Sequence, residues 1–500
     1  MKDGTKKKVA FIQNITNQLF NVMALSAHLK QHGHACDVFV SNFEHNILKR
    51  LKDYDPDVLA YSCVTGNMDF GLDLFRRYKR HNQKVLTVMG GPHPTFEPQC
   101  VLEDGIDAIV IGEGEGAMLD LCERWDGCQA SILDIENLAV ACKGELKRNP
   151  LRPLIENLDA LPYADRDIYD KYVYFRSLNN LSMIASRGCP FNCTYCYSHQ
   201  LKMLYNRLGR FVRFRSPEHV IGEVRQLIAK YPHLDFIGFD DSTFNSQHAW
   251  LLDFLQKYKE TCRVPFFCTM RADIANEEQV RMLAEAGCTA VFFAIEAGSY
   301  RLRKEILRRD MTDEQIITTA GWIRKYGMKL TVANLLGVPT ETEEETWQLV
   351  ELNMKIHPDR MGSQIFQPYP GTDLGKLSLQ LGLIDSIDVN KLGHYYYKSV
   401  LNQPGIRLQE RVHKLMYYFA RWPRLAFLWK ILIKYAPFDF LYLMFLVGLV
   451  DCFKHNSGFY WYRFIYYGII NVKAFSIFKI GQRRRREMSP AVSGRAPDAK

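Results

Sequence analysis

The sequence predicts an α/β protein with two successive α/β domains and a mainly helical, aromatic-rich region at its C-terminal end. Short apolar segments alternate with helix-length segments in two series, and a stretch with neither pattern separates the series. Polar and charged side chains follow the apolar segments of the second series. A chain of 500 residues exceeds what one hydrophobic core can hold, so we expect two or three domains.

Composition narrows the function classes. The 13 cysteines are too scattered for a disulfide scaffold, and no long apolar stretch follows the first lysines. We therefore expect a cytoplasmic protein whose clustered cysteines bind metal or take part in catalysis. The net charge of +9 includes the run Arg483–Arg486. This run is either a solvated end or a contact for an anionic membrane or nucleic acid. No aromatic and basic module accompanies it, so we expect no nucleic-acid partner.

Residues 1–145 form the first predicted domain. Strands are expected at residues 8–14, 35–41, 57–64, 84–91 and 107–116. Helical segments between them are typical of a doubly wound, Rossmann-like parallel sheet with helices on both faces. Glycines follow the last two strands, at Gly90, Gly91, Gly112, Gly114 and Gly116. They either let a ligand approach the carboxyl edge of the sheet or only form tight turns.

Residues 146–180 are rich in proline, aspartate and asparagine, which predicts a linker. Six further strand–helix units in residues 181–375 predict a partial or complete (β/α)6 barrel. Barrel enzymes place their chemistry at the carboxyl ends of the strands. The candidate residues at these ends are Cys189, Asp240, Asp241, Arg271, Asp273, Glu296 and Ser299.

Residues 376–500 are dense in tyrosine, phenylalanine, tryptophan and leucine. Their longest apolar segment, Phe438–Val450, is shorter than the about 20 residues needed to cross a bilayer. Pro437, Lys434 and Lys430 prevent its extension upstream. We therefore expect a helical cap that shapes the entrance of the barrel. A helix lying on a membrane surface is the alternative.

Three cysteines occur within eight residues of the segment SRGCPFNCTYCYSHQ. Zinc is one possible ligand of Cys189, Cys193 and Cys196, with His199 as a fourth donor, although structural zinc sites usually draw on two separated pairs. A [4Fe–4S] cluster is the other, because thiolates are its usual protein ligands. Three cysteines would leave one iron of such a cluster open for a substrate or cofactor.

The segment CPFNCTYC has the form Cys-x3-Cys-x-aromatic-Cys and resembles the signature of the radical S-adenosylmethionine (SAM) superfamily. Further segments resemble that family in the same order over nearly all of the predicted barrel. They are GFDDSTFN, CTMRAD, FFAIEAGS, NLLGVPTETEEET and PYPGTDL.

This resemblance implies that Cys189, Cys193 and Cys196 hold a [4Fe–4S] cluster whose open iron binds SAM. Reductive cleavage of SAM would give a 5′-deoxyadenosyl radical that abstracts hydrogen from an unactivated carbon. The protein would bind and orient the cofactors and the substrate, and it would exclude competing reactions. The residues implied in SAM binding are Tyr195, Asp240, Arg271, Glu296, Ser299 and Gly337.

Two of these assignments have alternatives. Asp240 and Asp241 either orient substrate or cap the helix expected near Ser246. Arg271 either contacts SAM or forms an ion pair with Asp273.

Three segments of the first domain are LAYSCVTGNMDFGLDLFRRYK, VMGGPHPTFEP and DAIVIGEGEG. They resemble the cobalamin-binding domain of the B12-dependent radical SAM class. The positions implied in cobalamin binding are Ser62, Thr65, Asn67, Gly90, Gly91, His93, Gly112 and Glu113. The Asp-x-His-x-x-Gly loop that supplies a cobalt-binding histidine in many cobalamin domains has no counterpart here. We therefore expect cobalamin bound without a protein histidine, or a domain that has kept the fold and lost the ligand.

Methyl transfer to an unactivated carbon of a small-molecule or lipid-like substrate is the leading predicted reaction. One SAM would supply the methyl group through cobalamin, and a second SAM would supply the radical. A cyclisation or rearrangement without methyl transfer is the alternative within the class. An iron–sulfur redox sensor or electron carrier is the alternative outside it. The expected partners are the substrate, a low-potential electron donor such as flavodoxin or ferredoxin, and peripherally a membrane.

Overall fold

The computed structural model of the chain describes residues 6–389, 392 and 397–454. Contacts divide the chain into a unit of residues 1–445 and a second unit of residues 446–500, of which only the end of one helix is described. Both sheets and all the candidate site residues belong to the first unit. The run Arg483–Arg486 lies outside the described residues.

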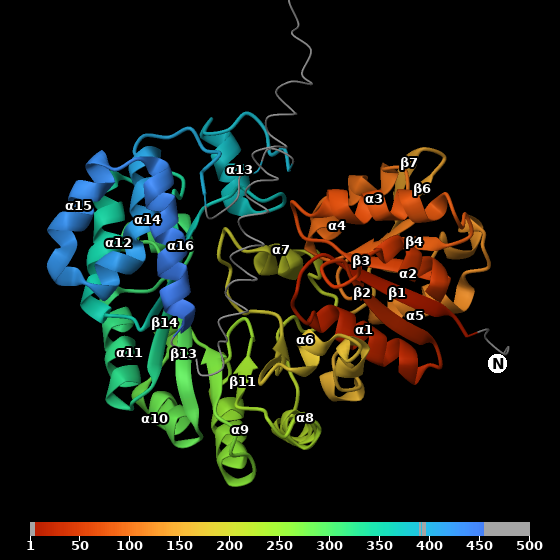
Figure 1. Cartoon of the computed structure of the whole chain (residues 1–500), viewed down its shortest axis with the longest axis horizontal. Helices are drawn as coiled ribbons and strands as arrows, with labels where there is room; N and C mark the ends of the chain where they lie inside the picture. The colour runs from red at the N-terminus through yellow and green to blue at the C-terminus, as the bar shows by residue number, and fades with distance from the viewer. Residues whose placement is uncertain (1–5, 390–391, 393–396, 455–500) are drawn as a thin grey trace, which may run out of the picture. The chain divides into compact units, whose positions relative to one another are not determined.

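The first sheet has seven strands in the order β2-β1-β3-β4-β5-β6-β7 (Figure 1). Their bounds are β1 Lys8–Gln13, β2 Ala35–Val40, β3 Val58–Ser62, β4 Leu86–Gly90, β5 Ala108–Val110, β6 Leu138–Cys142 and β7 Glu145–Arg148. Strands β1 to β5 are parallel, which confirms the predicted sheet, and β6 and β7 add an antiparallel hairpin.

Helices cover both faces of this sheet. They are α1 Phe20–Gln31, α2 Ile47–Tyr54, α3 Met68–Lys79, α4 Pro92–Phe96 and α5 Glu115–Arg124. Side chains alternate along β1, as the two-residue repeat of a strand requires. Val9 and Phe11 join the core that contains α1 and α5, whereas Ala10 and Ile12 join the core that contains α2 and α3.

The segment predicted as a linker contributes to the first domain. Strand β7 runs to Arg148, beyond the expected domain end at residue 145, and its side chains are mostly exposed, so no apolar pattern marks it. Farther on, Tyr169, Tyr172 and Phe175 pack into the core of the first sheet. The Tyr172 hydroxyl accepts a hydrogen bond from the Val40 amide at 3.0 Å. The domain boundaries stay predictions.

The second sheet has six parallel strands in the order β15-β14-β13-β12-β11-β8. Their bounds are β8 Asn180–Met183, β11 Phe236–Phe239, β12 Phe266–Thr269, β13 Cys288–Glu296, β14 Lys329–Leu336 and β15 Arg360–Ile365. Because β8 and β15 are the two edges and do not pair, the sheet is a partial barrel, as predicted. A two-stranded ladder, β9 Ser186–Arg187 with β10 Arg213–Phe214, lies beside it.

The helices of the barrel alternate with its strands. The short helix α6 Val173–Arg176 precedes them and carries Phe175 into the core of the first sheet. The barrel helices themselves are α7 Tyr197–Leu204, α8 Pro217–Lys230, α9 His248–Thr261, α10 Glu277–Glu285, α11 Asp313–Lys325 and α12 Glu343–Ile356. Capping boxes start three of them, with Asn276, Thr312 and Thr342 as the N-cap residues of α10, α11 and α12. These local signals fix where each crossover returns toward the next strand.

The C-terminal region is helical, as expected. Its helices are α13 Asp373–Gln380, α14 Ile406–Arg421, α15 Ala426–Tyr435 and α16 Phe438–Lys454. Helix α14 packs against α12 and β15, and α15 packs against α14 (Figure 1). The Ser363 hydroxyl of β15 and the His413 ring of α14 lie 2.8 Å apart in this contact. Among the described residues, no helix combines the length and the apolar character that crossing a membrane requires.

Candidate active site

The three cysteines lie on the loop that joins β9 to α7, at the carboxyl end of the first barrel strand. Gly188 opens this loop with a φ of +88°, and a Cβ atom there would lie 2.2 Å from the Phe211 carbonyl oxygen. Only glycine fits this position, so the path of the chain into Cys189 is fixed. Cys193 is buried and Cys189 is partly buried. Burial, together with the neighbouring thiols of Cys193 and Cys189, raises the pKa of Cys196 to about 11.

Backbone contacts from distant segments hold the cysteine loop. The Thr194 amide donates to the Leu307 carbonyl at 3.1 Å, and the Thr194 hydroxyl donates to the Ile306 carbonyl at 2.7 Å. The Thr194 carbonyl in turn accepts from the Leu374 amide at 2.9 Å. The loop is therefore clamped between the segment after β13 and the start of α13.

Tyr195 and Glu296, both partly buried, form a group with the buried Arg309 beside the cysteines. The Tyr195 hydroxyl donates to Glu296 Oε1 at 2.8 Å. Burial raises the pKa of Glu296, and the nearby Arg309 and Tyr195 oppose this rise. Arg309 is 5% exposed and donates through Nη2 to the Ala294 carbonyl at 2.5 Å. Within the described residues, Arg309 Nε has no hydrogen-bond partner, so a buried donor remains for a ligand.

Sequence reasoning missed Arg309. Burial opposes its charge, but Tyr195, Glu296 and Cys193 together raise the pKa of its guanidinium group. The adjacent Arg308 lies on the surface and pairs with Asp373 at 2.7 Å. Nothing in the sequence LRRD distinguishes the buried arginine from the exposed one.

Glu296 has a strained backbone. Its φ is +70°, a conformation that side chains other than glycine rarely adopt. The pairing of β13 with β14 shifts register between Ala294 and Glu296, at the same place. Non-glycine residues in this region cost on the order of 1–3 kcal/mol and cluster at functional sites. The strain is consistent with the predicted role of Glu296 in binding SAM.

Arg271 forms the ion pair that the sequence left as an alternative. Its guanidinium contacts Asp273 at 2.9 and 2.6 Å. Its Nη1 also lies 3.5 Å from Cys193 Sγ, and its guanidinium carbon lies 3.6 Å from the centre of the Phe191 ring. Arg271 thus faces the cysteine loop, where its positive charge would stabilise a thiolate.

The capping alternative for the two aspartates is wrong. Helix α9 begins at His248, and its N-cap residue Gln247 makes no side-chain capping bond. The buried Asp241 instead accepts two bonds of 3.1 Å from the Ala185 amide and a further bond from the Ser186 hydroxyl, so it fixes the strand end before the cysteine loop. Asp240 is exposed at the end of β11, and its contact with SAM stays a prediction.

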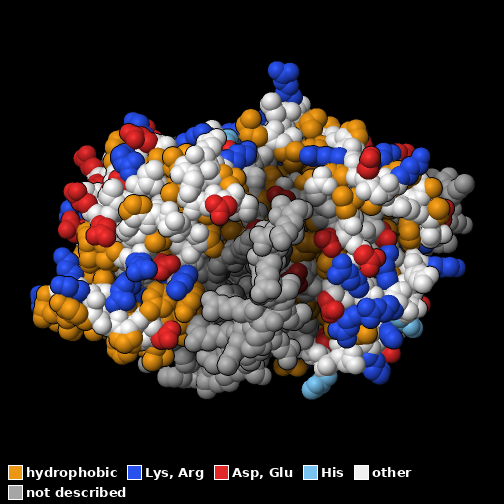
Figure 2. Space-filling model, turned by 90° about the horizontal axis from the view of Figure 1, so that it is seen from above, with side chains coloured by type: hydrophobic (Ala, Val, Ile, Leu, Met, Phe, Trp, Pro, Cys, Tyr) orange, Lys and Arg blue, Asp and Glu red, His pale blue; other side chains and the backbone are white. Residues whose placement is uncertain are grey.

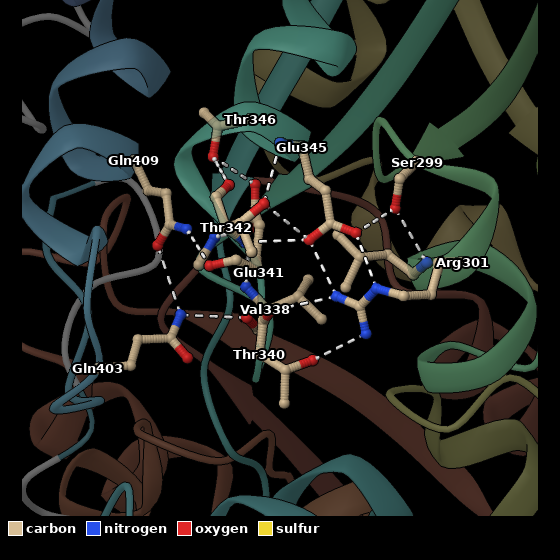
Figure 3. A network of polar contacts seen from close by, with 12 residues as sticks. Ser299, Arg301, Val338, Thr340, Glu341, Thr342, Glu345, Thr346, Gln403 and Gln409 are labelled. Carbon is tan, nitrogen blue, oxygen red and sulfur yellow. Dashed lines mark hydrogen bonds and ion pairs between the residues drawn. The ribbon is translucent and has the colours of Figure 1, made fainter.

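Ser299 and Gly337 contact a separate polar network, and Figure 3 shows Ser299 within it. The Ser299 hydroxyl donates to Glu345 at 2.6 Å, and Arg301 contacts the same carboxylate at 2.9 Å. The Gly337 amide donates to Glu341 at 2.7 Å. Figure 3 shows these groups converging on the loop between β14 and α12. The proposed contact of either residue with SAM is not tested by these bonds.

The residues assigned to cobalamin gather at the carboxyl edge of the first sheet. Ser62 ends β3, and Gly90 and Gly91 end and follow β4. The neighbouring residues Thr65 and Asn67 precede α3, and the Thr65 hydroxyl lies 3.4 Å from His93 Nδ1. The edge is lined by hydroxyl, amide and glycine positions, which suits a large neutral cofactor held by backbone contacts.

Glu113 differs from the other residues assigned to cobalamin. Its carboxylate accepts from Arg187 at 3.1 Å and from Arg213 at 2.8 Å, and these arginines flank the cysteine loop on β9 and β10. The Tyr205 side chain packs directly against Gly112, because a Cβ atom on Gly112 would lie 2.0 Å from the Tyr205 hydroxyl. Glu113 therefore joins the first sheet to β9 and β10, and Gly112 lies against the end of α7.

A cavity of about 220 Å³ opens beside Tyr195 at the ends of β14 and β15. Its lining consists of Tyr195, Leu335, Gln364, Ile365, Phe366, Gln367 and Tyr369. Among the residues that the structure describes, no charged side chain lines it. Its apolar wall continues into a cluster that includes Val338, Leu374 and Leu401, so the C-terminal region helps to form it.

The donor set suits an iron–sulfur cluster. One short loop supplies three thiols, and one of them, that of Cys193, lies beside the Arg271 guanidinium. His199, the fourth donor of the zinc alternative, lies with its Nε2 3.4 Å from Asp373. In residues 6–389, 392 and 397–454, no three His, Cys, Asp or Glu side chains are placed to hold a single metal ion. A four-iron cluster does not require this, because each thiolate binds a different iron atom.

Comparisons with known proteins identify the family. A model described as the radical SAM superfamily matches residues 183–352, and one described as the B12 binding domain matches residues 19–121. An uncharacterized methyltransferase of Pyrococcus horikoshii is 30% identical over 351 residues, which are 69% of this chain and 74% of that protein. The anaerobic magnesium-protoporphyrin IX monomethyl ester cyclase of Rubrivivax gelatinosus is 26% identical and covers 77% of this chain and 69% of its own length.

A solved structure has the same fold. The radical SAM methyltransferase TsrM of Kitasatospora setae, with cobalamin and a [4Fe–4S] cluster bound, aligns with a TM-score of 0.64 at 17% identity and covers 76% of each chain. The cofactors of this family are a [4Fe–4S] cluster, SAM and cobalamin. The alternative of an electron carrier or redox sensor is therefore wrong. This chain belongs to the B12-binding radical SAM enzymes.

Proposed function

We propose that this enzyme transfers a methyl group to an unactivated carbon of a small-molecule substrate. The observation that carries the proposal is the bond between Glu113 and Arg187. Arg187 stands two residues before Cys189, and Glu113 follows the last parallel strand of the first sheet. The cysteine loop and the cobalamin edge are thus held together, as a reaction that uses both cofactors needs. The Pyrococcus relative and TsrM, both described as methyltransferases, support the same reaction.

The residues of the site have distinct proposed tasks. When bound, the cluster and SAM supply a 5′-deoxyadenosyl radical, and cobalamin supplies the methyl group. Tyr195 and Arg309 orient the Glu296 carboxylate, which we propose to contact SAM. The unpartnered Arg309 Nε is available to an anionic group, such as the carboxylate of SAM. The apolar cluster at the barrel mouth keeps water from the reacting carbon.

The substrate is proposed to be uncharged where it reacts. The cavity beside Tyr195 presents aromatic rings, aliphatic side chains and two glutamine amides. A carboxylate or phosphate buried there would lack a cationic partner and would carry a desolvation cost. An apolar or lipid-like molecule, or a neutral aromatic one, satisfies this lining. A low-potential electron donor such as flavodoxin or ferredoxin completes the proposed set of partners.

A cyclisation or rearrangement without methyl transfer is the second candidate reaction. The observation that favours it is the relation to the cyclase of Rubrivivax gelatinosus.

The test begins with protein purified without oxygen and reconstituted with iron, sulfide and hydroxocobalamin. We expect about four iron atoms per chain, retained cobalamin, and 5′-deoxyadenosine formed from SAM after reduction. SAM labelled in its methyl group is then incubated with a neutral organic extract of the source cells. Label in an extracted product supports methyl transfer. Conversion of a compound in the extract to a new product that carries no label supports the second candidate reaction. Deoxyadenosine formed by protein that retains no cobalamin would overturn both candidate reactions. The Cys193→Ala protein is the blank.

A further inference from the structure

We propose that the outer face of helix α15 docks this protein on an anionic phospholipid surface. The outer face is defined by four hydrophobic residues and two lysines. They are Phe427, Leu428, Ile431, Tyr435, Lys430 and Lys434.

The sequence of α15 makes it apolar on two opposite sides. Phe427, Ile431 and Tyr435 follow one another at intervals of four residues, so they share one side of the helix. They are 65%, 49% and 70% exposed. On the opposite side, Trp429 and Ile433 are buried in the core of the barrel domain. A helix with apolar side chains on two opposite sides normally buries both sides, whereas the buried residues of α15 are Trp429 and Ile433 alone.

The exposed hydrophobic residues concentrate at this place. Of the 20 large hydrophobic side chains that are exposed among the described residues, eight lie between Trp422 and Leu443. Single exposed hydrophobic residues are ordinary, whereas a concentrated patch marks a contact surface. Figure 2 shows hydrophobic side chains with lysines and arginines among them at the end of the molecule where Figure 1 places α15.

The charges on this face select the partner. Lys430 Nζ lies 5.0 Å from the centre of the Trp347 ring, and Lys434 Nζ lies 5.1 Å from that of Tyr435. Within the described part of the chain, neither lysine forms an ion pair. Asp439 is the one acidic residue between positions 421 and 443, against four arginines and lysines.

These charges favour lipid over a second copy of the chain. A symmetric dimer through this face would set lysines against lysines, which is unfavourable. An anionic lipid surface meets both features, because aromatic and aliphatic side chains enter the interface while lysines bind the headgroups. No described helix is suited to cross a bilayer, so the contact is peripheral.

The experiment uses the full reconstituted chain and co-sedimentation with vesicles of phosphatidylcholine, with and without phosphatidylglycerol. We expect binding to the anionic vesicles that weakens as salt is added. The double variant Phe427→Ser with Ile431→Ser should bind at least about tenfold more weakly. The double variant Lys430→Glu with Lys434→Glu should lose about fivefold or more for each lysine. Val173→Ser, which removes a side chain 68% exposed on α6, is the matched control.

Deoxyadenosine formation without vesicles checks that each variant is folded. Three results would overturn the proposal. The first is no binding of the unaltered protein to anionic vesicles. The second is binding that the double variants leave unchanged, which would assign it to another part of the chain. The third is self-association, seen by light scattering, that the serine variant abolishes while vesicle binding stays absent.

Discussion

At the scale of single residues, Glu296 combines a strained backbone conformation with a carboxylate in the candidate site. Its side chain is partly buried, its hydrogen-bond donor Tyr195 stands between Cys193 and Cys196 in the sequence, and its φ is positive. Packing alone does not require a strained glutamate at a strand end. The register shift beside Glu296 accommodates this backbone conformation, and the hydrogen bond from Tyr195 to the Glu296 carboxylate helps to hold it.

Replacing Glu296 with glutamine should impair the use of SAM and leave the cluster intact. The amide keeps the shape but loses the negative charge, and a hydrogen bond to a charged group contributes about 1.5–3 kcal/mol. We therefore expect kcat/KM for deoxyadenosine formation to fall about 10- to 100-fold. Iron content should not change. The exposed Glu344→Gln is the control, and an unchanged kcat/KM in Glu296→Gln would contradict the assignment.

The adjacent arginines 308 and 309 offer a second test. Arg309 is enclosed with Tyr195 and Glu296, whereas Arg308 pairs with Asp373 on the surface. Arg309→Gln should reduce deoxyadenosine formation at least about tenfold, because it removes a buried charge and its donors. Arg308→Gln should change it less than about threefold, since exposed ion pairs contribute little. Equal effects of the two substitutions would show that burial beside Glu296 does not matter.

The cysteines and Glu296 could be predicted from the sequence because motif spacing places them at strand ends. The contacts of Asp241 and Arg309 could not. Asp241 accepts a hydrogen bond from the Ala185 amide. These two residues follow β11 and β8, and they come together only because these two strands pair. A sequence pattern identifies the strand that carries a residue. It does not identify the backbone group that the residue meets.

At the scale of elements, the loop between β14 and α12 folds around Glu341. This carboxyl accepts the amides of Gly337 and Val338 and the hydroxyl of Thr346. Gln409 of α14 donates to the Glu341 carbonyl at 3.0 Å. The loop thus ties the barrel to the C-terminal helices (Figure 3).

Glu341 should make stability depend on pH. Burial raises its pKa in the folded protein to about 7, from an ordinary value of 4.5. Below pH 4.5 the carboxyl is protonated in both states, and the full stability is present. As pH rises from 4.5 to 7 the unfolded chain ionises first, so stability falls by on the order of 3 kcal/mol.

Urea unfolding of the unaltered protein and of Glu341→Gln measures this contribution. The difference in unfolding free energy between them should change across that pH range and be constant above it. Glu343→Gln, on the first turn of α12, serves as the control. A difference that stays the same from pH 4.5 to 7 would contradict an elevated pKa.

At the scale of the whole molecule, the first sheet and the barrel are joined through charged groups next to the cysteine loop. Arg213 is 4% exposed, and the Glu113 carboxylate forms ion pairs with both Arg213 and Arg187. The Tyr205 hydroxyl adds a bond from the Glu113 amide at 2.9 Å and another from Asn137 at 3.0 Å. These polar contacts hold the carboxyl edge of the first sheet against the segments that flank the cysteine loop.

Glu113→Ala should destabilise the protein by about 3–5 kcal/mol, because it leaves a buried arginine without its carboxylate. It should also lower methylated product relative to deoxyadenosine, since the two cofactor sites would no longer be fixed to each other. Urea unfolding and the product ratio measure these effects. Asp73→Ala breaks the exposed pair with Arg77 and should cost less than about 1 kcal/mol. A normal product ratio in a folded Glu113→Ala protein would separate stability from positioning.

Both α/β domains follow from the alternation of strands and helices, so the order of the architecture was accessible from sequence. Its connections were not. Glu113 carries the glycine-rich pattern of a cofactor edge, yet its partners come from β9 and β10. Tyr169 and Tyr172 lie in a proline-rich stretch typical of a linker, yet they fill the core of the first domain. Such long-range contacts leave no periodic signal.

The clamp on Thr194 has a consequence for biosynthesis. The cysteines leave the ribosome well before Leu307 and Leu374, the residues whose backbones grip their loop. During that interval the nascent chain exposes three thiols without their final support. The supported loop therefore forms only after Leu374 has emerged from the ribosome, and oxidant or free zinc encountered earlier would compete for the same thiols.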